Sequence, residues 1–182
     1  GKLPLATSFP EKEMIFADEI PPVKQTEITT RDIKSRGGFY TFFYGEHYRD
    51  LYRDTFELPT LLLDTFAGGL FPVKVGGGGQ TNSLRLENAE AQQYVMRSTT
   101  KDASRFIPYP FNKITSVKSL VEETFLAAHP FAAVAIPPMS EACEIYHTAP
   151  KLYYIPKQPA LKEYNELFGD EVYLVERRPD ED

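Results

Sequence analysis

Four consecutive glycines at Gly76–Gly79 constrain the fold of this chain more than any other feature. Glycine has no side chain, so a run of four leaves the backbone with almost no steric restriction. The segment that follows, Ser83–Glu87, alternates apolar and polar residues as a half-buried strand does. Two interpretations of the glycine run stay open at this point. It is either a flexible hairpin tip or a turn whose backbone N–H groups approach a phosphate.

Length and composition predict one domain of ordinary size with an extension. The chain has 182 residues, of which 42% are hydrophobic and 25% charged, so a real core is expected. Its 15 prolines favour loops, strand edges and extended connectors over a helical bundle.

Charge and cysteine content exclude several classes of function. The net charge of −6 argues against nucleic-acid binding, because no basic face is large enough to neutralise many phosphates. A single cysteine, Cys143, excludes an intramolecular disulfide and a cysteine-rich zinc site. The three histidines lack ligand spacing to one another, so no metal site is predicted. The apolar runs are short and broken by Pro or Gly, so direct membrane insertion is not expected. No signal peptide is visible at the start of this sequence.

The hydrophobic pattern predicts an α+β domain: a mainly antiparallel sheet of about five strands with one main helix packed on it. Residues 1–57 read as an extended N-terminal arm, anchored by the aromatic tract Gly38–Gly45, with a short helical turn in Glu46–Asp54. The α+β domain spans 58–182. Its expected strands are Thr60–Phe66, Ser83–Glu87, Gln92–Ser98, Lys151–Ile155 and Glu171–Glu176, with a turn at Asn88–Ala91. The main helix is expected over Thr115–Ala128, a short helix over Met139–Ile145, and another over Pro159–Phe168 that ends at Gly169.

The glycine run belongs to a set of residues that could handle a phosphorylated ligand. Phosphoryl-transfer enzymes place backbone donors over the phosphates, a cation on a neighbouring strand and a carboxylate on a helix that orients the cation. Arg97, or less favourably Lys101, supplies the cation, and Glu122 or Glu123 supplies the helix carboxylate. No Gly-Lys-Ser/Thr follows, so this is not a Walker motif. The candidate phosphate-covering residues are Gly77, Gly78, Gly79, Gln80 and Thr81.

Two stretches resemble HipA-like kinases. Gly79–Leu86, followed by Tyr94-Val95-Met96-Arg97, is similar to the Gly-x-Gln-x-Lys…Tyr-Ile-x-Lys region of that group. Tyr173–Arg178 resembles its Leu-Val-Glu-Arg-Phe-Asp hinge. The resemblance implies a protein-kinase N-lobe whose adenine edge lies near Leu174–Arg177, with Glu176 among the nucleotide-binding residues. Arg97 stands where these kinases usually carry Lys.

A closer similarity is to large envelope-associated hypothetical proteins of Bacteroidetes-type bacteria, and it covers roughly Gly38 to Asp182. It implies a periplasmic or outer-membrane-associated location and contact with the remaining domains of a longer parent chain. The pattern is carried by Thr65–Leu70, the glycine–Gln-Thr-Asn-Ser-Leu-Arg-Leu run, Tyr94…Arg97-Ser98…Lys101-Asp102, Ala128-His129-Pro130 and Ile145-Tyr146-His147-Thr148.

The Asp-Arg-His pattern that follows in this group is not among these residues, so the catalytic base and magnesium ligands are expected beyond Asp182. The sequence therefore predicts an N-lobe-like domain with no catalytic residue and no cofactor of its own, which binds ATP and Mg²⁺ only with a downstream C-lobe. The alternative is a non-catalytic envelope interaction or structural module.

Overall fold

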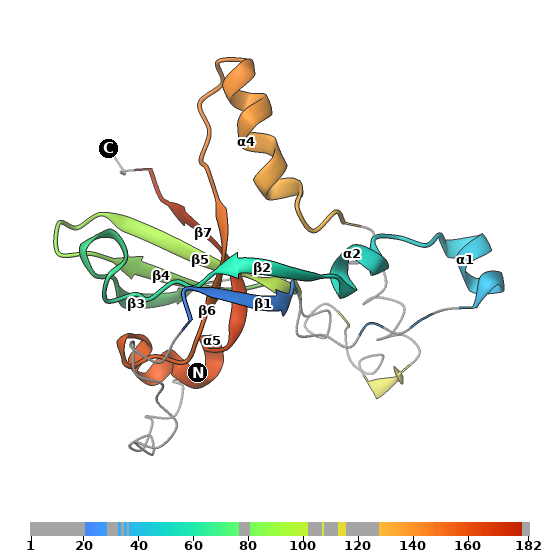
Figure 1. Ribbon diagram of the computed structural model, residues 1–182, viewed down its shortest axis with the longest axis horizontal. Helices are drawn as coiled ribbons and strands as arrows, with labels where there is room; N and C mark the ends of the chain where they lie inside the picture. Colours follow the sequence, from blue (N-terminus) through green and yellow to red (C-terminus); the bar gives the residue numbers. More distant parts are fainter. Residues whose placement is uncertain are drawn as a thin grey trace.

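The computed structural model describes residues 21–28, 33, 35, 37–76, 81–101, 107, 113–115 and 128–179. Within them the chain forms a five-stranded sheet, a separate two-stranded ribbon and several short helices (Figure 1). Helix α4 (Ala132–Ala142) rises from one side of the large sheet, and α5 (Asn165–Phe168) lies on the opposite side. The predicted α+β class is thereby confirmed.

The large sheet is antiparallel throughout and has the strand order β3-β4-β5-β7-β6. This is compatible with the expected kinase N-lobe-like arrangement, in which a glycine hairpin leads into a third strand that carries the cation. The predicted turn is also confirmed, because the Ala91 N–H donates to the Asn88 carbonyl at 3.1 Å. The strands are β3 (Phe71–Gly76), β4 (Thr81–Glu87), β5 (Gln93–Lys101), β6 (Lys151–Ile155) and β7 (Glu171–Arg177).

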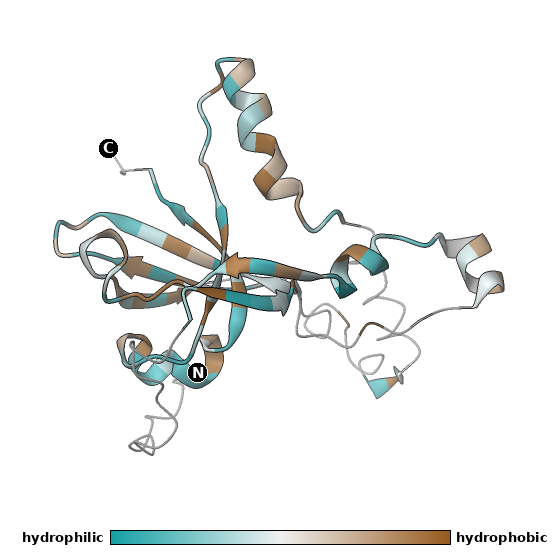
Figure 2. Cartoon of the chain, in the orientation of Figure 1, coloured by the Kyte–Doolittle hydropathy of each residue, from teal (hydrophilic) through white to brown (hydrophobic). Residues whose placement is uncertain are grey.

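One face of this sheet forms the main core. Leu84, Met96 and Val175 occupy one cross-strand row of β4, β5 and β7, and all three are buried. Since side chains alternate between faces, these residues point away from Arg85, Val95 and Leu174. Apolar and polar residues are mixed along the strands of the sheet (Figure 2). The rest of this core comes from three sources. The loop before β3 contributes Leu61, Leu63 and Leu70, and the segment between β6 and β7 contributes Leu161 and Phe168. Further strand residues are Leu86 on β4, Ile155 on β6 and Tyr173 on β7.

The segment between β6 and β7 covers the core with two short helical pieces. A 3-10 helix runs over Pro159–Tyr164 and α5 follows it, with a kink at Lys162 (φ 52°, ψ −132°). The single helix expected over Pro159–Phe168 is therefore divided. Gly169 does follow the helix end, but its φ of −83° needs no glycine. A side chain is excluded there because a Cβ would lie 2.5 Å from Lys157 Cγ and 2.6 Å from the Asn165 carbonyl oxygen.

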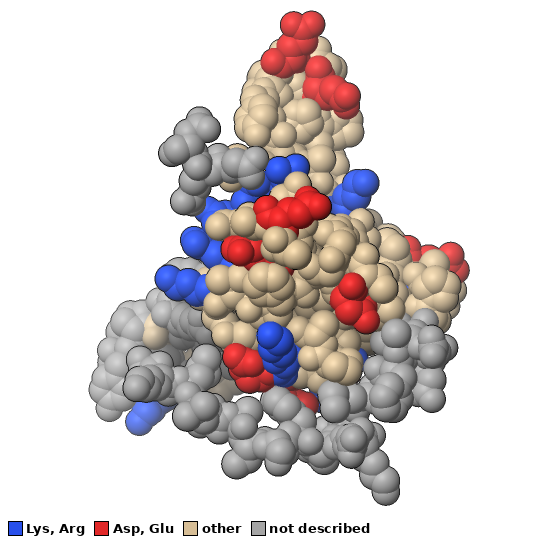
Figure 3. Space-filling view, turned by 90° about the vertical axis from the view of Figure 1, so that its left-hand side faces the viewer, with Lys and Arg blue, Asp and Glu red and all other residues tan. Residues whose placement is uncertain are grey.

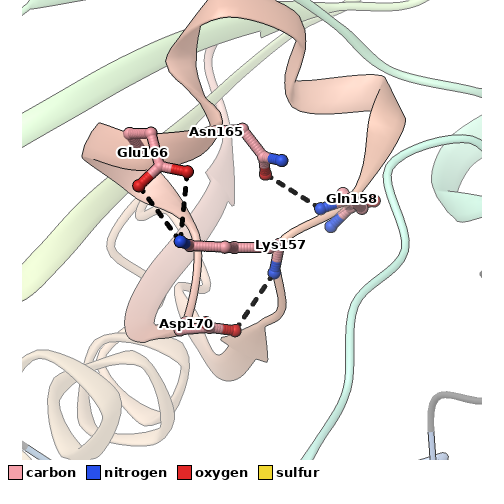
Figure 4. A network of polar contacts seen from close by, with 5 residues as sticks. All are labelled: Lys157, Gln158, Asn165, Glu166 and Asp170. Atoms are coloured by element: carbon pink, nitrogen blue, oxygen red, sulfur yellow. Dashed lines mark hydrogen bonds and ion pairs between the residues drawn. The ribbon is translucent and has the colours of Figure 1, made fainter. Parts of the chain in front are cut away.

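A polar network fixes this segment beneath the sheet (Figure 4). The Gln158 N–H donates to Asn165 Oδ1 at 2.9 Å, and Lys157 Nζ pairs with Glu166 Oε2 at 3.0 Å. The Gln158 side chain, 3% exposed, accepts from the Leu63 N–H at 2.7 Å and donates to the Leu61 carbonyl at 3.2 Å. Gln158 thus joins two segments of the core through hydrogen bonds to main-chain atoms.

The prediction of a strand over Thr60–Phe66 is wrong. A strand, β2 (Thr55–Pro59), ends just before this stretch, and Thr60 adds only an isolated bridge to Tyr154. Leu61 and Leu63 are buried, but as loop residues whose N–H groups bond to the Tyr154 carbonyl and to the Gln158 side chain. The chain then turns through a 3-10 helix at Phe66–Gly68 before β3 begins. Leu61 and Leu63 are therefore buried in the core although this segment does not form the hydrogen-bond ladder of a strand.

In the region predicted to be an extended arm, the described residues form a two-stranded ribbon and two short helices. Strand β1 (Val23–Glu27) pairs antiparallel with β2, so the boundary expected between residues 57 and 58 falls inside β2. The expected helical turn is present as α2 (Arg49–Arg53). The aromatic tract forms α1 (Gly38–Tyr44), but Phe39 and Phe42 are 83% and 82% exposed. These two rings are therefore largely open to solvent.

Helix α4 departs from the prediction at both ends. A short helix was expected over Met139–Ile145, after Pro137 and Pro138, but α4 begins at Ala132 and ends at Ala142 with both prolines inside it. Proline's fixed φ suits a helix, although each proline removes one N–H donor. Of the main helix expected over Thr115–Ala128, residues 116–127 lie outside the described residues. In the described part of the chain, no helix is long and apolar enough to cross a membrane.

Candidate functional site

The candidate site lies on the sheet face opposite the main core. Strand register places Gly76, Ser83, Arg97 and Leu174 in one row across β3, β4, β5 and β7. Arg97 therefore shares a face with the residue that begins the glycine run. Gly76 is also tightly fitted, because a Cβ at this position would lie 2.7 Å from Ser83 Oγ.

Arg97 forms an ion pair across the sheet. Its Nη2 lies 3.0 Å from Glu176 Oε1 on β7. Because Arg97 is paired in register with Leu174, the contact with Glu176 runs diagonally to the next residue on the same face. The Arg97 side chain is 56% exposed and that of Glu176 only 12%. The carboxylate is thus held against the sheet while much of the guanidinium faces solvent.

Glu176 is fixed from a second direction by Thr148. The Thr148 hydroxyl donates to Glu176 Oε2 at 2.7 Å, so each carboxylate oxygen has its own partner. Thr148 lies in the connector between α4 and β6. In the same connector, His147 Nδ1 lies 2.9 Å from the Ile145 carbonyl oxygen. The arrangement orients Glu176 and, through it, the guanidinium of Arg97.

A pocket of about 250 Å³ opens between these residues and α4. Its walls are largely apolar, and its charged groups are Arg97 and Glu176. A second pocket of about 460 Å³ lies on the other side of Arg97, between the sheet, α2 and the segment at 128–133. Arg97, Ala133 and Leu174 line both. The smaller pocket is lined by Arg97, Leu174 and Glu176 of the sheet, by Ala133, Ile136 and Pro137 of α4, and by His147, Thr148 and Pro150.

Of the predicted site residues, Arg97 and Glu176 come together in space. Thr81 is the first residue of β4, two residues after the glycine run, and pairs with Lys101 at the end of the β4–β5 hairpin that is far from its turn. Gly77, Gly78, Gly79, Gln80 and Glu122 lie outside the described residues. The sequence had offered a helix carboxylate as the partner of Arg97, whereas the partner among the described residues is a strand carboxylate.

Sequence reasoning missed Thr148 and the contribution of α4. The Ile-Tyr-His-Thr motif that contains Thr148 was identified only as part of a family resemblance. No local pattern signals that this hydroxyl reaches a strand encoded 28 residues later. Among the described residues, no three His, Cys, Asp or Glu side chains gather in a way that could hold a metal ion.

Chemically, the described part of the arrangement can bind an anion through Arg97. An arginine beside a pocket can bind a phosphate through two parallel N–H donors. Glu176 is occupied by two partners, which suits orientation better than proton transfer. Comparison of the chain with protein-family models, with curated proteins and with solved structures finds no match.

Proposed function

We propose that this chain is an N-lobe-like domain that supplies half of a nucleotide- or phosphate-binding site and has no catalytic activity of its own. The observation that carries the proposal is the position of Arg97. It stands on the strand next to the glycine hairpin, beside a pocket, and is oriented by Glu176. Kinase-like sites place a cation in this relation to a glycine-rich hairpin, with a carboxylate that orients it.

The exposure of Arg97 supports ligand binding over a purely structural ion pair. Glu176 engages Nη2, and the side chain remains 56% exposed. A guanidinium that is held by a carboxylate on one side and exposed to solvent on the other can bind a phosphate through its remaining N–H donors, without first breaking the ion pair. A charge-assisted contact of this kind contributes about 1.5–3 kcal/mol.

The size of the pocket supports the idea of half a site. The pocket that includes Glu176 measures about 250 Å³. Pockets for small molecules and cofactors are typically about 300–1,000 Å³. The neighbouring pocket of about 460 Å³ also includes Arg97 and Leu174 but not Glu176. A nucleotide that contacts Glu176 and has its adenine near Leu174–Arg177 therefore needs a further wall beside the smaller pocket. We propose that a downstream C-lobe of the parent chain provides it, together with the magnesium ligands and the catalytic base.

The proposed location and partners rest on the resemblance to envelope-associated proteins. The domain belongs to an envelope-associated protein, in the periplasm or at the outer membrane, and contacts the remaining domains of its parent. Nucleic acid is not a partner, because the chain carries a net charge of −6.

The test is titration calorimetry with ATP and Mg²⁺ on two proteins, the 182-residue chain and the same chain extended through the downstream segment. We expect binding by the extended protein and its loss in the Arg97→Ala variant. Lys151→Gln is the matched control, because Lys151 is an exposed cation on the other face of the same sheet. Failure of the extended protein to bind ATP would refute the proposal.

One observation favours the alternative, a non-catalytic interaction module. The second half of α4 and the residues after it expose Met139 (67%), Ile145 (60%) and Tyr146 (83%). Exposed apolar side chains that lie close together often mark contact surfaces. In this alternative the surface packs against a neighbouring domain of the parent chain. Arg97→Ala then leaves the function of the parent protein intact, whereas Met139→Asp disrupts it.

A further inference from the structure

Two further cations lie on the same sheet face as Arg97. Lys74 on β3 and Arg85 on β4 are directly opposite each other in the strand register. Arg85 is in turn paired with Val95, and the neighbouring row pairs Ser83 with Arg97. Arg85 and Arg97 are therefore diagonal neighbours. Three cations from three adjacent strands follow one another across this face, close to the start of the glycine run.

Directly opposed like charges are unfavourable in a sheet. In a regular antiparallel pair such side chains have Cβ atoms about 4.5–5.5 Å apart, and the repulsion destabilises the pairing. The β3–β4 register shifts between Pro72 and Lys74, directly before this pair. Both Lys74 and Arg85 are exposed, and neither forms an ion pair or side-chain hydrogen bond within the described part of the chain. The repulsion is therefore not relieved by the protein residues that the structure describes.

The acidic residues near these cations leave the face with an excess of positive charge. Glu176 already engages Arg97 and Thr148. Glu87 lies two residues after Arg85 on β4 and therefore on the same face, but no ion pair joins it to a described cation. In Figure 3, several Lys and Arg side chains gather on one side of the molecule below α4. The whole chain is acidic, with a net charge of −6, so this local excess runs against its overall charge.

We propose that Lys74, Arg85 and Arg97 form a binding track for a chain of linked phosphate groups. The inference rests on the proposed phosphate site at Arg97 and deepens it by naming two further residues, Lys74 and Arg85, that contact the linked phosphates of an oligophosphate. One phosphate lies between Lys74 and Arg85 and relieves their repulsion. A linked phosphate reaches Arg97 across the diagonal, which measures about 7–8 Å between backbone positions.

The track discriminates by the number of phosphates. A monophosphate can satisfy either the Lys74–Arg85 pair or Arg97, whereas a triphosphate can contact all three. Each additional charge-assisted contact of about 1.4 kcal/mol corresponds to a tenfold change in affinity. A triphosphate should therefore bind at least about tenfold more tightly than a monophosphate.

The test uses the 182-residue chain with inorganic triphosphate and inorganic phosphate as probes. Binding is followed by amide chemical shifts in NMR and by the rise in Tm on ligand addition. The variant Lys74→Gln/Arg85→Gln removes both charges, Arg85→Lys keeps the charge, and Lys151→Gln is the control on the opposite face. We expect triphosphate to raise the Tm of wild type, Arg85→Lys and Lys151→Gln, with the rise lost in the double variant.

A second expectation, the Tm without ligand, shows whether the double variant is folded. Without ligand, its Tm should equal or exceed that of wild type, because the repulsion has been removed. No triphosphate binding by wild type, or equal binding by wild type and the double variant, overturns the inference.

A parallel titration of the extended protein with ATP separates this inference from the proposed function. If ATP binding requires Arg97 but is unchanged in Lys74→Gln/Arg85→Gln, the nucleotide site stands and the track does not exist. If triphosphate binds through Lys74 and Arg85 but ATP binds the extended protein no better than triphosphate, the track stands and the nucleotide proposal fails.

Discussion

Arg97 on β5 reaches diagonally to Glu176 on β7, joining a mostly exposed guanidinium to a carboxylate that is almost wholly covered. The two partners are therefore not equivalent. Losing Arg97 leaves the Glu176 carboxylate with Thr148 as its partner, whereas losing Glu176 frees a guanidinium that water can solvate. The pair orients Arg97 more than it stabilises the fold, because exposed ion pairs contribute little.

Arg97→Ala should lower the free energy of unfolding by only about 1 kcal/mol. The reason is that the guanidinium is 56% exposed and Glu176 keeps the hydroxyl of Thr148. Urea denaturation of wild type and variant measures the difference. A loss above about 3 kcal/mol, the size seen when a buried pair is broken, would show that Arg97 is a structural residue.

Gln158→Ala should destabilise the protein by about 1–3 kcal/mol for each buried group that it leaves unpaired. The side chain is 3% exposed and forms hydrogen bonds with both the Leu63 N–H and the Leu61 carbonyl. Glu166→Gln, in the same network, is the matched control. It removes an ion pair on a side chain that is 55% exposed and should cost no more than about 1 kcal/mol. Equal losses in the two variants would mean that Gln158 does not hold the two segments together.

Gly76→Ala should destabilise the β3–β4 hairpin. The new Cβ would lie 2.7 Å from Ser83 Oγ, and overpacking of this kind costs about 1–3 kcal/mol. Ser83→Ala removes the obstructing oxygen, so the double variant should recover most of the loss. A double-mutant cycle measured by thermal unfolding gives the coupling directly. Additive effects of the two substitutions would argue against this contact.

Alkaline pH should weaken the fold through Tyr154. Burial, and then the Asp170 carboxylate that accepts a hydrogen bond from its hydroxyl, raise the pKa of Tyr154 to about 12. The unfolded chain loses this proton near pH 10, about the ordinary value for tyrosine. The folded state holds the proton more tightly, so its stabilising effect is complete below about pH 10 and is lost as the pH rises toward about 12.

Tyr154→Phe should reduce this loss of stability, and Asp170→Asn should move the pKa of Tyr154 down toward its ordinary value. Tyrosinate absorbance, taken as the difference between wild type and Tyr154→Phe, isolates the titration of this residue. Burial and Glu171 raise the pKa of Tyr173 as well, and that effect cancels in the difference. An unchanged Tyr154 titration in Asp170→Asn would contradict the role given to Asp170.

Four strands of the large sheet were predictable from sequence. Lys151–Ile155 is a strand with the predicted bounds, and the strands expected at Ser83–Glu87, Gln92–Ser98 and Glu171–Glu176 differ only at their ends. Each is a short run with apolar or aromatic residues, and Ser83–Glu87 also alternates apolar and polar residues. Thr60–Phe66 is a short apolar run of the same kind but is not a strand. Its backbone partners, Tyr154 and Gln158, lie far along the chain and leave no signal in the local pattern.

For the candidate site, the sequence by itself determined the residue types. A glycine run stands before a strand, an arginine lies on the next strand, and Glu176 lies in a hinge-like stretch near the end. Only the tertiary structure decided which of these meet: Glu176 with Arg97, Thr148 with Glu176, and Lys74 opposite Arg85. The physical reason is strand register. A shift of one residue moves every side chain to the other face, and the register is fixed by pairing and core packing between segments distant in sequence.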